Sequence, residues 1–244
     1  MKSPRQLVTR AIVQLVHTVQ RAYFREHNRL YAERWHPHNA LLEDALAETV
    51  DYIKTNMKQA MIRSDAYDVL TYASHQVALD GLYLEFGVRT GKTINHIARL
   101  NPAVTIYGFD SFEGLPENWS GWLQDKGTFA GEGIPEVDTN VRLVTGWFEE
   151  SLPPFLADHE GQLALAHIDS DIYSSARTVL DNLAPRIQPG SIIVFNEYFN
   201  YPNWKEHEYK AFREFCEQHE VDYEYLCWGM YEVAVKILAI RDDG

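Results

Sequence analysis

Beyond Gly81, short apolar runs alternate with longer helical segments, and this alternation limits the possible folds more than any other feature of the chain. Such alternation is typical of βαβ units, which build a mostly parallel sheet. The last two runs face each other across the short connection Gly229–Glu232, which favours an antiparallel hairpin. We therefore expect an α/β fold whose seven-stranded, mostly parallel sheet ends in a C-terminal antiparallel hairpin. The expected strands are Leu82–Phe86, Thr105–Phe109, Val141–Thr145, Ala164–Ile168, Ser191–Phe195, Tyr223–Trp228 and Ala234–Ile240, with crossover helices at Thr93–Leu100 and Ser174–Leu183.

The first 80 residues follow a helical pattern instead, so we divide the chain into an N-terminal helical extension, residues 1–80, and a domain, residues 81–244. Further helices are expected from His38 to Met57 and after Ser64, which we expect to be an N-cap. An apolar stripe on the first helix favours packing within the domain, with a lid or a dimer interface as alternatives. We expect a homo-oligomer formed through these helices. The stripe comprises Val8, Ile12, Leu15, Val19 and Tyr23.

Composition excludes several classes of protein. The formal net charge of −13 repels phosphate backbones, so we expect no nucleic-acid partner. No run approaches the roughly 20 apolar residues that span a bilayer, and the start of the chain lacks the pattern of a signal peptide. The two cysteines, Cys216 and Cys227, are too few and too far apart for a structural zinc site or a disulfide scaffold. We therefore expect a cytoplasmic protein without a membrane partner.

The first expected strand leads into a turn that contains two glycines. Gly87 and Gly91 allow the backbone to bend tightly and to approach a ligand without an intervening Cβ. Two phosphate-binding motifs do not fit this turn. The dinucleotide motif fails because Arg89 occupies the position of its second glycine. The P-loop fails because only three residues separate Gly87 from Gly91, whereas a P-loop has four between its glycines. Glu85 would repel an anion and instead suits a positively charged ligand. The turn therefore predicts a site for a cationic cofactor.

The ends of the next two strands carry residues suited to a nucleoside. In open α/β sheets, ligands bind beyond the carboxyl ends of the strands. Asp110 follows the second strand, where a carboxylate can accept hydrogen bonds from both ribose hydroxyls. The third strand leads into Gly146, Trp147 and Phe148, and either ring can wall an apolar slot for adenine. The alternative is that both rings are ordinary core residues.

Oxygen-bearing side chains follow the fourth and fifth strands. Asp169 and Asp171 lie in one strand-to-helix turn, and Asn196 and Glu197 lie in the next. Asp169, Asn196 and Glu197 together offer ligands for a hard cation such as Mg²⁺, and Asp169 or Glu197 can instead serve as a general base. We expect Asp171 to cap the helix that follows. His207 is a second candidate for the base, or else a solvated helix residue.

Three segments of the chain together resemble the macrocin O-methyltransferase group, which belongs to the Rossmann-like methyltransferases and includes sugar O-methyltransferases of antibiotic biosynthesis. The segments are Glu85–Thr93, Tyr107–Pro116 and His167–Ser175, and the resemblance extends from Gly81 to about Phe215. It implies S-adenosylmethionine as cofactor and O-methylation of a small-molecule acceptor, such as a sugar or another hydroxyl of a secondary metabolite. It also implies that Asp169 is a metal ligand and base. The cofactor residues implied, with Trp147 and Phe148 near the adenine, are Glu85, Gly87, Gly91, Asp110, Ser111, Phe112, Gly146, Trp147 and Phe148.

One departure from the group concerns the metal. Metal-dependent members usually carry two adjacent acids after the fifth strand, whereas this chain has Asn196 and Glu197. An asparagine still offers a carbonyl oxygen, so Mg²⁺ stays a candidate cofactor, with one charge fewer at the site. Two other functions stay open: a non-catalytic scaffolding protein, and an NAD-dependent oxidoreductase, against which Glu85 argues. We expect Pro116–Trp122 and Tyr198–Trp204 to wall the acceptor pocket.

Overall fold

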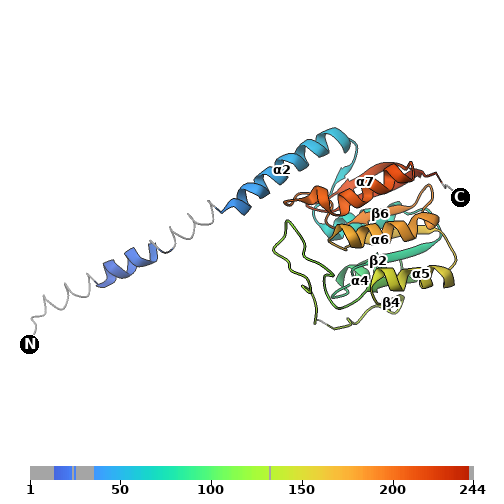
Figure 1. Ribbon diagram of the computed structural model, residues 1–244, viewed down its shortest axis with the longest axis horizontal. Coiled ribbons are helices and arrows are strands. Elements are labelled where there is room, and N and C mark those ends of the chain that lie inside the picture. The colour runs from blue at the N-terminus through green and yellow to red at the C-terminus, as the bar shows by residue number, and fades with distance from the viewer. Residues whose placement is uncertain (1–13, 24, 26–35, 132, 242–244) are drawn as a thin grey trace, which may run out of the picture. The chain divides into compact units, whose positions relative to one another are not determined.

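The computed structural model describes residues 14–23, 25, 36–131 and 133–241 (Figure 1). Within them, eight strands form one sheet in the order β1-β7-β8-β6-β5-β2-β3-β4. The strands are β1 (Met61–Ile62), β2 (Leu82–Phe86), β3 (Ile106–Asp110), β4 (Val141–Thr145), β5 (Leu163–Ile168), β6 (Ile192–Phe195), β7 (Asp222–Trp228) and β8 (Val233–Ala239). The helices are α2 (Pro37–Asn56), α3 (Ala66–Gln76), α4 (Lys92–Leu100), α5 (Phe148–Asp158), α6 (Tyr173–Leu183), η1 (Ala184–Arg186), η2 (Trp204–Glu206) and α7 (Glu208–Gln218).

The pairing of the strands confirms the expected fold class. Strands β2 to β6 pair in parallel, and β8 runs antiparallel to both β6 and β7. All seven expected strands are present, with their ends displaced by at most one residue. The eighth strand, β1, pairs in parallel with β7, and the apolar pattern missed it because it has only two residues, both exposed.

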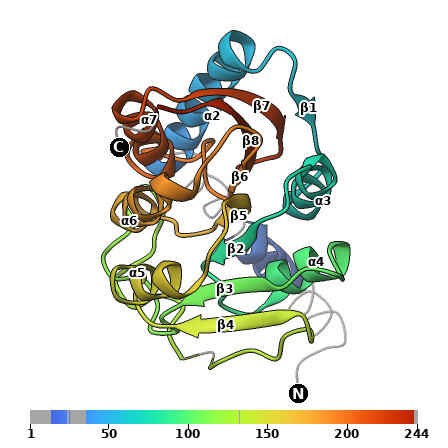
Figure 2. The ribbon, with the colours of Figure 1, turned by 90° about the vertical axis from the view of Figure 1, so that its right-hand side faces the viewer.

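Helices cover both faces of the sheet (Figure 2). Helices α5, α6 and α7 pack against one face, and α3 and α4 pack against the other. Every residue of β2, β5 and β6 is buried, which explains their nearly continuous apolar sequences. The carboxyl ends of these central strands therefore lie side by side on a rigid support.

The chain divides into two compact units, Met1–Asp44 and Ala45–Gly244. The second unit holds the sheet and includes β1 and α3, which precede the predicted division at residue 80. In the first unit, Leu15, Val19 and Tyr23 of the expected apolar stripe lie on a helix and are exposed. Val8 and Ile12 of that stripe lie outside the described residues. Among the described helices, none is long and apolar enough to cross a membrane.

The start of α3 differs from the prediction by one residue. Asp65, not Ser64, is the N-cap, because its side chain accepts a hydrogen bond from the backbone N–H of Asp68. The Ser64 hydroxyl instead donates to the carboxylate of Asp65. Both residue types are good caps, so sequence preference alone did not distinguish them.

Replacing the cap tests this assignment. We expect Asp65→Ala to lower the melting temperature by about 2–4 °C, the usual effect of losing an N-cap in a chain of this size. Asp65→Asn should stay close to the wild type, since asparagine caps helices as well. The assignment is wrong if Ser64→Ala lowers the melting temperature more than Asp65→Ala in differential scanning calorimetry.

Candidate active site

A cavity of about 380 Å³ opens at the carboxyl ends of the central strands. Its size is that of a small-molecule site. Loops after β2, β3, β4, β5 and β6 all contribute to its lining. The predicted residues that line it are Gly87, Asp110, Ser111, Phe112, Gly146, Trp147, Phe148, Asp169, Asn196 and Glu197. Three predicted residues, Glu85, Gly91 and His207, are not part of the lining.

The two glycines of the first turn have different tasks. Gly87 has a φ of 95°, and a Cβ at this position would lie 1.8 Å from the backbone oxygen of Asp169. Only glycine therefore allows the loop after β2 to touch the loop after β5. Gly91 has a φ of 75° and is the N-cap of α4, so it shapes the turn without reaching the cavity.

Asp110 organises the same turn through hydrogen bonds. Its Oδ2 accepts from the backbone N–H groups of Val88 (2.9 Å) and Arg89 (2.7 Å). Its Oδ1 accepts from the N–H of Phe112 at 2.7 Å. Each carboxylate oxygen can accept two hydrogen bonds, so Oδ2 is fully used and Oδ1 keeps one acceptor position for a ligand. Binding of a ribose by Asp110 stays a prediction.

Glu85 lies beneath the cavity rather than in it. Its side chain is fully buried, and its Oε2 lies 2.9 Å from Nδ1 of His167 on the neighbouring strand β5. Thr93 donates a hydrogen bond to its Oε1 at 3.0 Å. Burial alone would lower the pKa of His167, but its hydrogen bond to Glu85 and the charge of Glu85 raise the pKa above the usual value. Glu85 therefore links two strands, an arrangement that its position in the sequence did not reveal.

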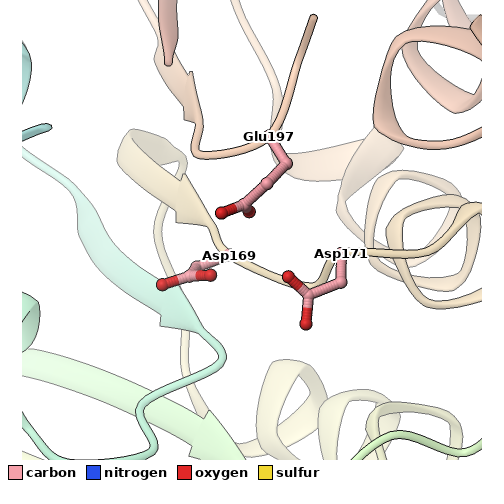
Figure 3. A group of neighbouring side chains, drawn as sticks. All are labelled: Asp169, Asp171 and Glu197. Carbon is pink, nitrogen blue, oxygen red and sulfur yellow. The ribbon is translucent and has the colours of Figure 1, made fainter. Parts of the chain in front are cut away.

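Three carboxylates lie close together in the part of the cavity formed by the loops after β5 and β6 (Figure 3). Asp169 follows β5, Asp171 lies in the same loop, and Glu197 follows β6; ligand oxygens from all three lie within 4.8 Å of one another. We call these three residues the carboxylate cluster. Burial raises the pKa of Asp169 to about 8, with the charge of Asp171 adding to the shift. Burial and the charge of Glu208 raise the pKa of Asp171 to about 7, and burial also raises that of Glu197.

The expectation that Asp171 caps the next helix is wrong. Ile172 is the N-cap of α6, and no side chain caps that helix. Asp171 has a φ of 66°, a left-handed conformation that is uncommon outside glycine. This conformation directs its carboxylate toward Asp169 and Glu197 (Figure 3).

The remaining predicted groups have specific partners. Asn196 donates from Nδ2 to Oε1 of Glu197 at 2.7 Å, while Oε2 of Glu197 is buried without a hydrogen-bond partner among the described residues. His207 is buried, and its Nε2 lies 2.7 Å from the backbone oxygen of Ser120. Burial lowers the pKa of His207. As the ring contacts the loop over the cavity and not the cavity itself, the structure does not bring it to the carboxylate cluster.

The predicted aromatic wall is divided between two layers. Trp119 lines the cavity, but Trp122 does not and instead stacks on Tyr201 with ring centroids 5.9 Å apart. The segment Tyr198–Trp204 supplies buried rings behind this loop and no lining residue. The aromatic segment thus supports the wall of the pocket rather than forming it.

Several lining residues escaped the sequence analysis. They belong to the loops around the cavity, to the first turn of α5 and to the first turns of α6, and they include Arg89, Phe129, Glu149, Ser170, Ser174, Ser175 and Thr178. The spacing of Ser174, Ser175 and Thr178 after Asp171 places hydroxyls on one face of a helix start, which was a usable signal. The buried residue Glu208 was also missed, because its contacts lie far away along the chain.

Comparison with known proteins agrees with this site. Residues 84–198 match the family model described as a methyltransferase domain. The chain is 30% identical over 171 residues to 8-demethyl-8-(2,3-dimethoxy-α-L-rhamnosyl)-tetracenomycin-C 4'-O-methyltransferase of Streptomyces olivaceus, an alignment that covers 59% of this chain and 64% of that relative. It is 28% identical to demethyldecarbamoylnovobiocin O-methyltransferase of Streptomyces niveus, covering 44% of this chain and 47% of the relative.

A solved structure gives the same result. The crystal structure of CalS11, a calicheamicin methyltransferase, matches with a TM-score of 0.57 and 26% identity over 68% of this chain and 76% of CalS11. Residues 84–198 are therefore similar to the methyltransferase-domain family, and the resemblance found in the sequence is confirmed at that level. The alignments span less than two thirds of both curated relatives.

The raised pKa values predict how stability depends on pH when divalent cations are absent. The unfolded chain releases the Asp169 proton near pH 4, whereas the folded chain retains it up to about pH 8, so folding becomes less favourable as pH rises through this range. We expect the melting temperature of the wild type in EDTA to fall between pH 5 and 9. Asp169→Asn should show a smaller fall, and equal slopes for the two proteins would contradict the assignment.

Proposed function

We propose that this chain transfers the methyl group of S-adenosylmethionine to a hydroxyl group of a small molecule. The observation that carries the proposal is a single cavity that joins a glycine turn and aromatic rings on one side to the carboxylate cluster on the other. The similarity to proteins named O-methyltransferases supports the same reaction. A sugar hydroxyl is the proposed acceptor, since the tetracenomycin relative is named for a rhamnosyl group.

The cofactor would occupy the side of the cavity formed by the loops after β2, β3 and β4. Gly87 leaves space beside the backbone, and Asp110 fixes the turn while its Oδ1 retains one acceptor position for a ribose hydroxyl. Trp147 and Phe148 line this side and offer apolar faces for adenine. Ser111 and Phe112 complete the loop after β3.

The carboxylate cluster has the character of a divalent-cation site. Asp169, Asp171 and Glu197 supply oxygen ligands within 4.8 Å of one another, and Oε2 of Glu197 has no hydrogen-bond partner among the described residues. Hard cations such as Mg²⁺ prefer oxygen ligands of this kind. When bound, such an ion lowers the pKa of an acceptor hydroxyl. The carbonyl oxygen of Asn196 would be an additional ligand, since its amide nitrogen is already used by Glu197.

The protein itself has two tasks in this reaction. It must hold the acceptor hydroxyl in line with the methyl carbon, which supplies much of the rate through proximity. Ser174, Ser175 and Thr178 line the cavity beside Asp171 and offer hydroxyls to a polar acceptor, while Trp119 offers an apolar face. The protein must also accept the hydroxyl proton, and we assign this task to Asp169, because it lines the cavity and a cation bound beside it would keep it a carboxylate.

Methyl transfer to a nucleotide-linked or free rhamnose and to a simple phenol tests the proposal. We expect turnover of a sugar acceptor, and Asp169→Asn should lower kcat by at least about 100-fold, as expected for loss of a general base. The affinity for S-adenosylhomocysteine, measured by calorimetry, should remain within about threefold, because Asp169 lies on the acceptor side of the cavity. The exposed Asp158→Asn on α5 is the matched control and should behave as the wild type.

The possible results separate the competing functions. Binding of S-adenosylhomocysteine without turnover of any acceptor would favour a non-catalytic protein. Binding of NAD in place of S-adenosylhomocysteine would favour an oxidoreductase. Full turnover by Asp169→Asn would contradict its role as base.

We also propose that the chain forms a homo-oligomer through its N-terminal helices. Leu15, Val19 and Tyr23 recur at four-residue intervals, and about 60–65% of each side chain is exposed. An exposed stripe of this kind is suited to packing against a second helix. Replacing all three with serine should shift the mass measured by sedimentation toward the monomer, and an unchanged oligomer would contradict the proposal.

A further inference from the structure

Glu208 stands out among the buried acids, because it belongs to neither the carboxylate cluster nor the cavity lining. It is the first residue of α7, and its side chain is completely buried. A carboxylate in this position has no access to water, so its charge depends on hydrogen-bond donors supplied by the protein. Those donors show what the residue does.

The donors come from the two loops that carry the carboxylate cluster. Oε1 of Glu208 accepts from the backbone N–H groups of Ser170 (3.1 Å) and Asp171 (3.3 Å), in the loop after β5. Oε2 accepts from the N–H of Glu197 at 3.1 Å, in the loop after β6. One carboxylate therefore connects both loops, with one oxygen for each.

These contacts begin where the hydrogen bonds of the sheet end. The N–H of Asp169 donates to the carbonyl of Phe86, and the N–H of Asn196 donates to the carbonyl of Ile168. The next N–H along each loop, from Ser170 and from Glu197, has no strand beside it and is satisfied by Glu208. Glu208 thus continues the sheet pattern by one residue in both loops.

We propose that Glu208 is a positioning residue that sets the separation of the carboxylates of Asp171 and Glu197. Its contact with the N–H of Asp171 holds that residue in its left-handed conformation. A glutamine cannot do the same, because an amide has one acceptor oxygen and two loops require one each. A carboxyl group is therefore retained here although it adds a fourth buried acid beside the cluster. This proposal rests on the proposed function in one respect: it takes the carboxylate cluster as the place where the reaction occurs.

Amide hydrogen exchange in the full chain, measured by NMR, tests the contacts without any ligand. Glu208→Gln should raise the exchange rate of the Ser170 or the Glu197 amide at least about tenfold, since one of them loses its acceptor. The amides of Asp169 and Asn196 serve as internal controls and should be unchanged, because their acceptors lie in the sheet. Unchanged exchange at both Ser170 and Glu197 would overturn the proposal, whether or not the chain is a methyltransferase.

Binding of Mn²⁺ alone, followed by electron paramagnetic resonance, tests the consequence for the cluster. Glu208→Gln should weaken binding by about 10-fold to 100-fold, the usual cost of losing a residue that orients metal ligands. The affinity for S-adenosylhomocysteine and the KM for S-adenosylmethionine should not change, while kcat falls. The exposed Glu206→Gln, two residues earlier, is the matched control.

A second variant covers the case in which Glu208→Gln does not fold. Glu208→Asp keeps both acceptor oxygens but withdraws them by one methylene, so we expect a folded protein with Mn²⁺ affinity between those of the wild type and the glutamine variant. Equal losses of Mn²⁺ affinity and S-adenosylhomocysteine affinity in a folded variant would indicate a general structural role and overturn the proposal. If the wild type itself binds no Mn²⁺, the proposed divalent-cation site is contradicted. The hydrogen-exchange experiment still decides the role of Glu208.

Discussion

The crowding of buried acids at one edge of the sheet is the constraint on which the site depends. Asp169, Asp171 and Glu197 bring ligand oxygens within 4.8 Å of one another, and Glu208 lies beside them. Burial and mutual repulsion raise the pKa values of these acids, so the cluster holds protons near neutral pH unless a cation replaces them. Burying these acids together lowers the stability of the fold, and such destabilising clusters are typical of functional sites that bind a cation or accept a proton.

The two sides of the cavity are tied together by backbone contact. Gly87 passes so close to the backbone oxygen of Asp169 that no side chain fits between them. Asp110 fixes the same turn through the backbone N–H groups of Val88 and Arg89. A cofactor held at this turn would therefore have a fixed position relative to Asp169, which in-line transfer between two bound molecules requires.

Much of the fold could be predicted because it follows from local pattern. The central strands are short, apolar and separated by helices, so their bounds were found to within one residue. Strand β1 has only two residues, too few to show an apolar pattern, and it was not predicted. At the site, glycines and acids at strand ends were found for the same reason, since ligands bind beyond the carboxyl ends of parallel strands.

The contacts at the site that the sequence did not predict involve partners distant in the chain. Glu85 faces His167 across the sheet, 82 residues away, and His207 contacts Ser120 at a separation of 87. Asp171 was expected to cap a helix because its position suits a cap, but it has a left-handed conformation and its N–H contacts Glu208, 37 residues away. Such pairings depend on tertiary packing and have no signal in a single sequence.

The most direct measurement is a crystal structure of the chain with S-adenosylhomocysteine and Mn²⁺, with the ion located by its anomalous signal. We predict one ion held by Asp169, Asp171 and Glu197, and a cofactor at the Gly87 turn whose sulfur faces that ion across the same cavity. A cofactor bound elsewhere, or an ion held by none of these carboxylates, would contradict the view that one cavity joins the methyl donor to the group that activates the acceptor.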